Sequence, residues 1–163
     1  YYPQRSVGDE QIGSFSTYGM GLQAALAHGP VGVQLYYTQT GKGFDTQSPF
    51  GDHASYLNLM QVAFNTAGEK AWGIGGNVNF ADLGVPGLTA AAIYADSRKR
   101  IDSQTGSPIP DRNETNVRVD YAVGKGSVLE GLVATFRYSW LHQDGSPQTQ
   151  TQLRAILNYA VRF

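Results

Sequence analysis

Apolar side chains recur at every second position along most of this 163-residue chain. Successive side chains of a β-strand point to opposite faces, whereas a helix would scatter such a set around its axis. The pattern is clearest at the C-terminus, in Leu153, Ala155, Leu157, Tyr159, Val161 and Phe163. The same alternation predicts seven strands, each with one apolar and one polar face, at residues 18–26, 31–37, 72–80, 88–94, 117–123, 132–140 and 153–163.

Charged residues are scarce in this chain. Asp, Glu, Lys and Arg make up 15% of it, and none of them occurs between Gln11 and Gly41. The mean hydropathy is nevertheless −0.30, and the absence of any run of about 18 apolar residues excludes membrane-spanning helices. A net charge of −1 argues against nucleic-acid binding driven by charge. The absence of Cys excludes disulfides and thiolate metal sites.

The connections between the predicted strands alternate in length. The short ones are Gly29-Pro30 and residues 82–87 and 124–131; the others are residues 41–69 and 101–112 and a polar loop at 143–148. Transmembrane β-barrels have short periplasmic turns and longer extracellular loops. If Phe163 lies at the periplasmic side, the short connections all fall at the periplasmic ends of the seven strands and the other connections at the extracellular ends. Residues 3–13 then belong to an extracellular loop. The sequence therefore predicts an all-β, antiparallel transmembrane β-barrel.

The aromatic residues give a second indication of a membrane protein. They gather near the two ends of the predicted strands, while the middles of the apolar faces are mostly Leu, Val and Ala. Amphipathic rings prefer the level of the lipid headgroups, so two girdles are typical of a transmembrane barrel. The extracellular girdle is predicted to contain Tyr18, Tyr37, Trp72, Tyr94, Tyr138 and Trp140, and the periplasmic one Phe80, Tyr121, Tyr159 and Phe163.

The last predicted strand ends on Phe163, with Val161 and Tyr159 at the alternate positions before it. This terminal pattern resembles the signal that the barrel assembly machinery of the outer membrane recognises. We therefore expect a multi-pass protein of the Gram-negative outer membrane, in contact with the lipid bilayer and with lipopolysaccharide. The basic tract Arg98-Lys99-Arg100 is interpreted as a solvated strand end, with contact to lipopolysaccharide phosphates as the alternative.

Three motifs follow one another in the middle of the chain. They are Phe50-Gly51-Asp52-His53 with Ser55-Tyr56-Leu57, then Ala67-Gly68-Glu69-Lys70-Ala71-Trp72, then Phe80-Ala81-Asp82-Leu83-Gly84-Val85-Pro86-Gly87-Leu88. In this order they resemble the C-terminal part of OprD-type substrate-specific porins, and the resemblance runs from about Tyr1 to Phe163. It implies a single-chain barrel of about eighteen strands with a basic ladder on its inner wall. It also implies passage of small water-soluble nutrients, usually carrying a carboxylate.

Seven strands are too few for such a barrel, and an open sheet leaves two edges that hydrocarbon cannot satisfy. We therefore expect residues 1–163 to be the C-terminal part of a single, longer β-barrel porin domain. The N-terminal strands and the inward-folded constriction loop are expected outside this chain. The alternative is a complete barrel of about eight strands with a structural or adhesion role, although residues 1–13 show no convincing strand.

Arginines on the polar faces of the last strands form the main candidate site. They are Arg118, Arg137, Arg154 and Arg162, with Asp120 beside them. A water-filled lumen accepts such charges, whereas an Arg at the middle of the lipid face costs about 2–4 kcal/mol. Guanidinium groups stay charged and bind carboxylates bidentately, so we expect small anionic or zwitterionic solutes to pass along them. The alternative is that Arg118 pairs with Asp120 and that Arg162 is a rim residue.

The long loop at residues 41–69 supplies a second candidate site. Asp52, His53 and Tyr56 are expected to line the extracellular vestibule, the alternative being a loop held by its own hydrogen bonds. Apolar residues from Tyr56 to Phe64 recur at helical spacing. This spacing predicts a short helix or helical turn that folds over the pore mouth or packs on a neighbouring loop.

Enzyme chemistry is not indicated. The three histidines are dispersed without metal-ligand spacing, and no G-x-S-x-G nucleophile motif exists, which disfavours a membrane-bound hydrolase. A soluble β-sandwich would stay monodisperse without detergent. We expect a passive channel with no catalytic residues, metal or cofactor, in which pore width and inward-facing arginines set selectivity.

Overall fold

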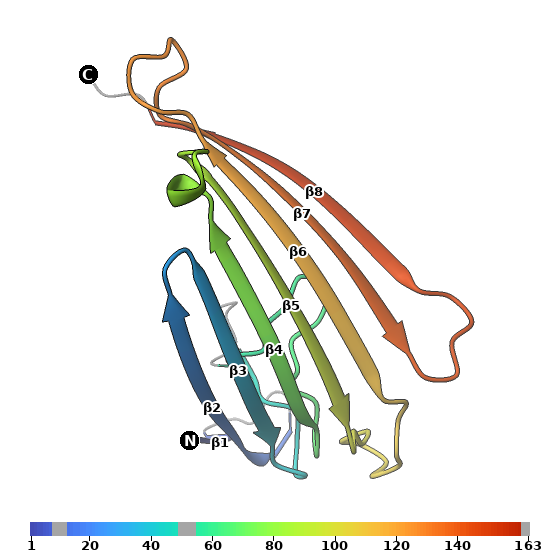
Figure 1. The fold of residues 1–163 in the computed structure, drawn as a ribbon. Helices are drawn as coiled ribbons and strands as arrows, with labels where there is room; N and C mark the ends of the chain where they lie inside the picture. Colours follow the sequence, from blue (N-terminus) through green and yellow to red (C-terminus); the bar gives the residue numbers. More distant parts are fainter. Residues whose placement is uncertain (8–12, 49–54, 161–163) are drawn as a thin grey trace.

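The computed structural model describes residues 1–7, 13–48 and 55–160. They form one antiparallel sheet in which each strand pairs with its sequence neighbours, with β1 and β8 at the two edges (Figure 1). The strands are β1 (Tyr2–Arg5), β2 (Ser16–His28), β3 (Val31–Thr40), β4 (Lys70–Asn79), β5 (Leu88–Arg98), β6 (Arg112–Ala122), β7 (Leu132–Gln143) and β8 (Gln150–Tyr159). One 3₁₀ turn, η1 (Ala81–Leu83), lies between β4 and β5. Within the described ranges, no helix has the length and apolar character needed to cross a membrane.

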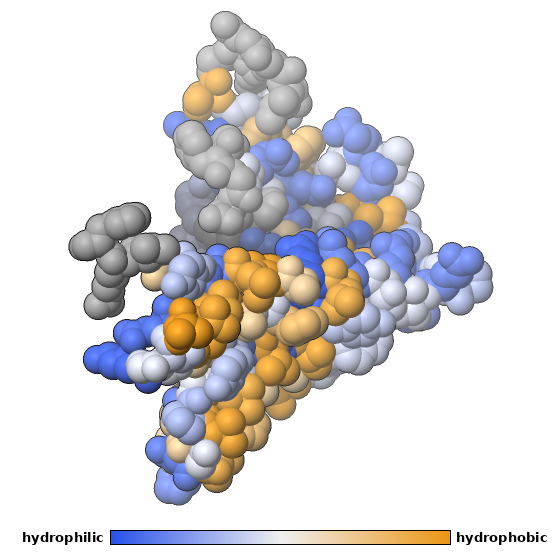
Figure 2. Space-filling model, turned by 90° about the horizontal axis from the view of Figure 1, so that it is seen from above, coloured by the Kyte–Doolittle hydropathy of each residue, from blue (hydrophilic) through white to orange (hydrophobic). Residues whose placement is uncertain are grey.

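The alternation of side chains is confirmed on every strand from β2 to β8. One face, called the outer face, carries exposed apolar residues, for example Leu22, Leu35 and Leu157, the last being 73% exposed. The opposite, inner face carries Gln34, Arg137 and other polar residues. In the view of Figure 2, hydrophobic side chains gather on one side of the sheet and hydrophilic loops on the other. Each strand therefore separates an apolar from a polar environment.

Aromatic side chains gather toward the two ends of the outer face, as predicted. At the end where the long loops emerge, called the loop end, Trp72 and Tyr94 on neighbouring strands lie 5.6 Å apart between ring centroids. Tyr138 and Trp140 of β7 lie 5.1 Å apart at the same end. Tyr121, at the opposite or turn end, is 46% exposed. Such rings fit the two headgroup levels of a bilayer.

The sheet has eight strands rather than seven, because residues 2–5, expected in a loop, form β1. Tyr2–Arg5 pairs antiparallel with the first residues of β2, from Arg5 opposite Ser16 to Tyr2 opposite Gly19. The segment is only four residues long and contains Pro3, which has no backbone N–H. A proline is tolerated on an edge strand, and β1 occupies the edge of this sheet. The alternation signal is too short there to be read from sequence.

The predicted helix between Tyr56 and Phe64 is wrong. These residues form a hairpin-like tip: Asn58 and Ala63 make an antiparallel bridge, and the N–H of Leu59 donates to the carbonyl of Val62 at 2.9 Å. Of the apolar residues in this segment, Leu57 and Phe64 are buried in the core, and Leu59 and Val62 pack against it. The connection lengths also alternate less strictly than predicted, since residues 144–149 at the loop end are fewer than residues 123–131 at the turn end.

The buried core lies between the long loop and the inner face of the sheet. Leu57 and Phe64 of the loop pack with Ala71 of β4 and Ala95 of β5. The chain between β3 and β4 passes behind the sheet as drawn in Figure 1. Residues 55–69 of this connection lie on the inner face of the sheet. This loop, called the inward loop, brings polar backbone close to the arginines of β6, β7 and β8.

Candidate functional site

Three of the predicted arginines stand in one row across the inner face. Arg118 of β6 is paired in register with Arg137 of β7, and Arg137 with Arg154 of β8. Neighbouring strands lie about 4.8 Å apart, so the register places three arginine residues in one row on the same face. We call these residues the arginine row. The fourth predicted arginine, Arg162, lies outside the described residues.

The three guanidinium groups of the row have different partners. Arg118 forms a bidentate ion pair with Asp120, at 2.6 and 2.8 Å, and the hydroxyl of Thr135 also donates to Asp120. The ion pair considered as the alternative for Arg118 is therefore present. Arg154 donates from Nη2 to the Met60 carbonyl at 3.0 Å. Arg137 has no hydrogen bond or ion pair with another described residue, and its charge interacts at longer range with Asp120.

Glycines on the inner face make room for the inward loop. A Cβ at Gly21 of β2 would lie 2.9 Å from the ring of Tyr56, and one at Gly73 of β4 would lie 2.8 Å from Leu57. Both distances are shorter than van der Waals contact, so any larger residue would displace the loop. Tyr56, predicted to line the vestibule, thus rests on the inner face of β2 with half of its surface exposed.

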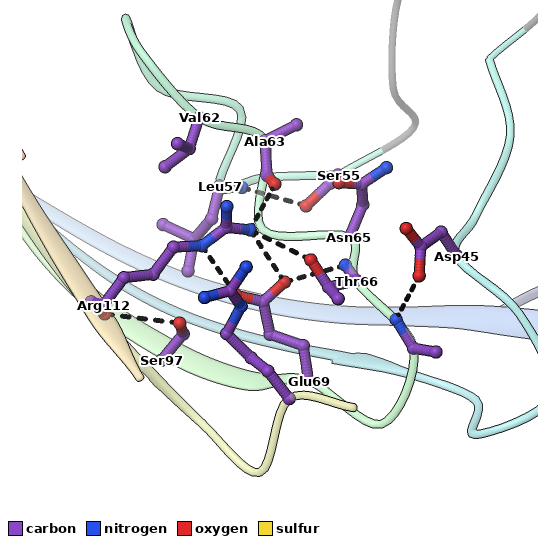
Figure 3. A network of polar contacts seen from close by, with 12 residues as sticks. Asp45, Ser55, Leu57, Val62, Ala63, Asn65, Thr66, Glu69, Ser97 and Arg112 are labelled. Carbon is purple, nitrogen blue, oxygen red and sulfur yellow. Dashed lines mark hydrogen bonds and ion pairs between the residues drawn. The ribbon is translucent and has the colours of Figure 1, made fainter. Parts of the chain in front are cut away.

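The base of the inward loop is held by a buried ion-pair network (Figure 3). Glu69 is fully buried and accepts from Nε and Nη2 of Arg112 at 3.2 and 3.1 Å. Its Oε2 also accepts from the N–H of Thr66 at 2.8 Å. Arg112 further donates to the Ala63 carbonyl at 2.9 Å, and its guanidinium lies 5.3 Å from the centroid of the Phe64 ring. These contacts tie the loop to the start of β6.

Arg100 belongs to this network and not to a solvated strand end. Its side chain is 9% exposed, and its Nε lies 3.6 Å from Oε1 of Glu69. Burial lowers the pKa of Arg100, the nearby charge of Arg112 lowers it further, and Glu69 opposes both effects. In the predicted basic tract, only Arg98 and Lys99 are exposed, because the chain turns at Lys99, where φ is +64°.

A cavity of about 370 Å³ lies on the inner face beside the arginine row. Arg118 and Arg137 line one side of it, and Asn58 and Leu59 of the inward loop line another. Amide side chains complete the wall: the Gln34 amide donates to Asn77 Oδ1 at 2.9 Å. The cavity therefore places the Arg118 and Arg137 side chains beside several amide groups that can form hydrogen bonds.

The remaining predicted residues lie elsewhere. Asp52 and His53, and the assembly-signal residues Val161 and Phe163, are outside the described residues. Tyr159 lies at the end of β8, paired with Leu132, and is exposed on the outer face. In the described ranges, no group of three His, Cys, Asp or Glu residues could hold a metal ion.

Sequence reasoning missed the two buried carboxylates that hold the inward loop, Glu69 and Glu114. Glu114 occupies an inward-facing position of β6 and accepts three backbone N–H groups of the loop. Its place on the polar face, two residues before Asn116, was readable from the alternation. Glu69 stands inside one of the three motifs. What the sequence does not reveal is that each carboxylate meets a loop rather than water.

The chain was compared with known proteins. A family model described as outer membrane porin, OprD family, matches residues 1–163. Porin D of Pseudomonas aeruginosa is 27% identical over 181 residues, which cover 97% of this chain and 41% of Porin D. The crystal structure of Pseudomonas aeruginosa OpdK with vanillate is similar with a TM-score of 0.85 at 20% identity, covering 95% of this chain and 41% of OpdK.

A BenF-like porin from Pseudomonas fluorescens Pf-5 gives the same TM-score of 0.85 at 19% identity, over 94% of this chain and 40% of that porin. The chain thus spans about two fifths of the length of the relatives that it matches. These structural matches show the fold, an antiparallel sheet of the outer-membrane barrel type. They do not favour a complete small barrel.

Proposed function

The chain belongs to the OprD family of outer membrane porins, and on this premise we propose that it forms part of the wall of a diffusion channel. Proteins of this family are β-barrels of the Gram-negative outer membrane. The apolar outer face and its two aromatic zones suit contact with lipid. Because the chain spans about two fifths of its relatives, we infer that residues 1–163 are the C-terminal part of a larger barrel domain. Transport would be passive, with no cofactor and no covalent step.

The arginine row is the observation that carries the proposed selectivity. Arg118 is neutralised by Asp120 and Arg154 is bonded to the inward loop, so Arg137 is the group of the row that is available to a solute. A guanidinium that faces a narrow aqueous cavity attracts carboxylates. We propose that the solutes are small anions or zwitterions that carry a carboxylate, such as amino acids or aromatic acids. The relative OpdK has been crystallised with vanillate, which is a carboxylate.

Two further partners are proposed for the outer face. Tyr159, Val161 and Phe163 occupy alternate positions at the end of the sequence and would be read by the barrel assembly machinery. Arg98 and Lys99 are exposed at the loop end, beyond the Trp72–Tyr94 aromatic pair. Basic side chains just outside an aromatic girdle lie at the level of lipid phosphates. We propose that these two residues contact lipopolysaccharide.

Ion selectivity of the full-length porin tests the proposed channel function. In planar bilayers under a salt gradient, Arg137→Gln combined with Arg154→Gln should lower the ratio of anion to cation permeability. Arg98→Gln combined with Lys99→Gln is the matched control, because it also removes two positive charges, here from exposed side chains at the loop end. An unchanged permeability ratio in the double variant would overturn the role of the arginine row.

A further inference from the structure

Glu114 is an acidic side chain buried in the middle of the sheet without a cationic partner among the described residues. Its side chain is fully buried, and its two oxygens accept hydrogen bonds from the inward loop. Oε1 accepts from the N–H groups of Met60 and Gln61 at 3.0 and 2.9 Å, and Oε2 accepts from that of Val62 at 2.9 Å. Asn116 donates to Oε1 at 2.6 Å. A buried carboxylate is tolerated only when donors of this number surround it.

The three backbone donors belong to consecutive residues because the loop turns sharply there. The N–H of Leu59 donates to the Val62 carbonyl, and the N–H of Phe64 to the Leu57 carbonyl. In such a turn, successive N–H groups point to the same side and form a concave nest for an anion. These donors have no acceptor within the turn itself, so an external oxygen must satisfy them. Glu114 supplies that oxygen from a strand.

The position of this tip determines which side chains of the arginine row contact the loop and which remain available on the inner face. With the tip in place, the Met60 carbonyl accepts from Arg154. The Gln61 amide donates to the Ser139 hydroxyl at 2.9 Å and to the Gln150 carbonyl at 3.3 Å. Leu59 lines the cavity that Arg137 also lines. The loop tip therefore contacts all three strands that carry the row.

We propose that Glu114 is the positioning residue of this channel wall. It holds the tip of the inward loop against the sheet, keeps Arg154 engaged with the loop and leaves Arg137 as the group that meets the solute. The effect of Glu114 on selectivity rests on the proposed channel function. The proposal that Glu114 fixes the position of the loop tip does not depend on that function. The two roles can therefore be tested separately.

Cysteine accessibility tests the hold on the tip directly. The chain has no Cys, and Met60 is only 6% exposed, so a cysteine introduced as Met60→Cys should react slowly with a charged, water-soluble thiol reagent. Adding Glu114→Gln places an NH₂ group against backbone N–H donors. The modification rate in the full-length porin should rise at least about tenfold, the effect of losing one charge-assisted hydrogen bond. Glu130→Gln, in the exposed turn between β6 and β7, is the control and should leave the rate unchanged.

Two further variants keep the test decisive if Glu114→Gln does not insert into membranes. Glu114→Asp keeps the charge but withdraws the carboxylate from the turn, and Asn116→Ala removes both the donor to Oε1 and the amide oxygen that accepts from the Met60 N–H at 3.1 Å. Both should raise the modification rate of the introduced cysteine, each by less than Glu114→Gln. A rate that stays at the level of Met60→Cys alone in every variant would refute the proposal.

Single-channel recording separates the positioning role from the channel function. Glu114→Gln should increase current noise and raise the solute concentration that half-blocks the ion current, because the tip and Arg154 no longer hold fixed places. An increased modification rate with unchanged selectivity in the arginine double variant would reject the proposed role of the arginine row in selectivity and keep the positioning role. An unchanged modification rate would reject the positioning role whatever the selectivity.

Discussion

The buried network at the base of the inward loop gives the sharpest stability prediction. Glu69 is fully buried between Arg112, 11% exposed, and Arg100, 9% exposed. Glu69→Gln keeps the shape of the side chain but removes its charge and turns one acceptor oxygen into a donor. If the amide nitrogen replaces Oε1, Arg112 Nε loses its acceptor. If it replaces Oε2, both Arg112 Nη2 and the Thr66 N–H lose theirs. Two buried guanidinium groups then lose the carboxylate that they share, and among the described carboxylates Arg100 keeps only its interactions with Asp111 and Asp45.

Loss of the charge of one member of a buried ion pair costs about 3–5 kcal/mol, because the partner charge stays buried without compensation. A single charge-assisted hydrogen bond contributes roughly 1.5–3 kcal/mol, so the loss of one or two such bonds lies in the same range. We therefore expect Glu69→Gln to lower the free energy of unfolding of the porin by about 3–5 kcal/mol. The loss should be insensitive to salt, because the network is shielded from solvent.

Urea unfolding of the porin in lipid vesicles, followed by tryptophan fluorescence, measures this loss. Glu130→Gln removes a carboxylate from an exposed turn and should change stability by no more than about 0.5 kcal/mol. Arg112→Met combined with Glu69→Gln should be less destabilised than the sum of the single variants, with a coupling of roughly 0.5–3 kcal/mol. If Glu69→Gln is as stable as Glu130→Gln, the network does not hold the loop and the reasoning fails.

Two further predictions concern the two faces of the sheet. Gly73→Ala introduces a methyl group 2.8 Å from Leu57 and should destabilise the porin by about 1–3 kcal/mol. In the same urea titration, Gly124→Ala is the control and should be near neutral, because a methyl group there has no neighbour within 4 Å. Ala155→Arg on the outer face of β8 should cost about 2–4 kcal/mol in lipid vesicles, whereas Ile156→Arg on the inner face should be tolerated. Equal losses at positions 155 and 156 would contradict the assignment of the faces.

The sequence predicts the strands and their faces well because both depend on neighbouring residues. The alternation of apolar and polar residues along β8, from Gln150 to Tyr159, can be recognised without knowing the rest of the fold, because it depends only on the order of residues in that strand. The placement of Arg118, Arg137 and Arg154 on one face follows from the same parity. Strand β1 was missed because four residues with a proline carry too little pattern, and pairing with β2 stabilises them instead.

The partners of the arginines were less readable. Arg118 and Asp120 are two positions apart on one strand, so their ion pair was foreseen as an alternative. Arg100 was assigned to a solvated end because it follows two basic residues. Its burial depends on Glu69, which comes from another loop, and no local pattern records that contact.

The inward loop shows where local information ends. Met60 and Glu114 meet across 54 positions of sequence, and Arg154 reaches Met60 across 94. Backbone N–H groups look alike in any sequence, so nothing in residues 59–62 indicates that a carboxylate will satisfy them. The alternating side chains alone assign the lipid face, the lumen face and the charges on each. The place of the loop against the arginine row arises from contacts between distant segments, because its hydrogen bonds join groups that only folding brings together.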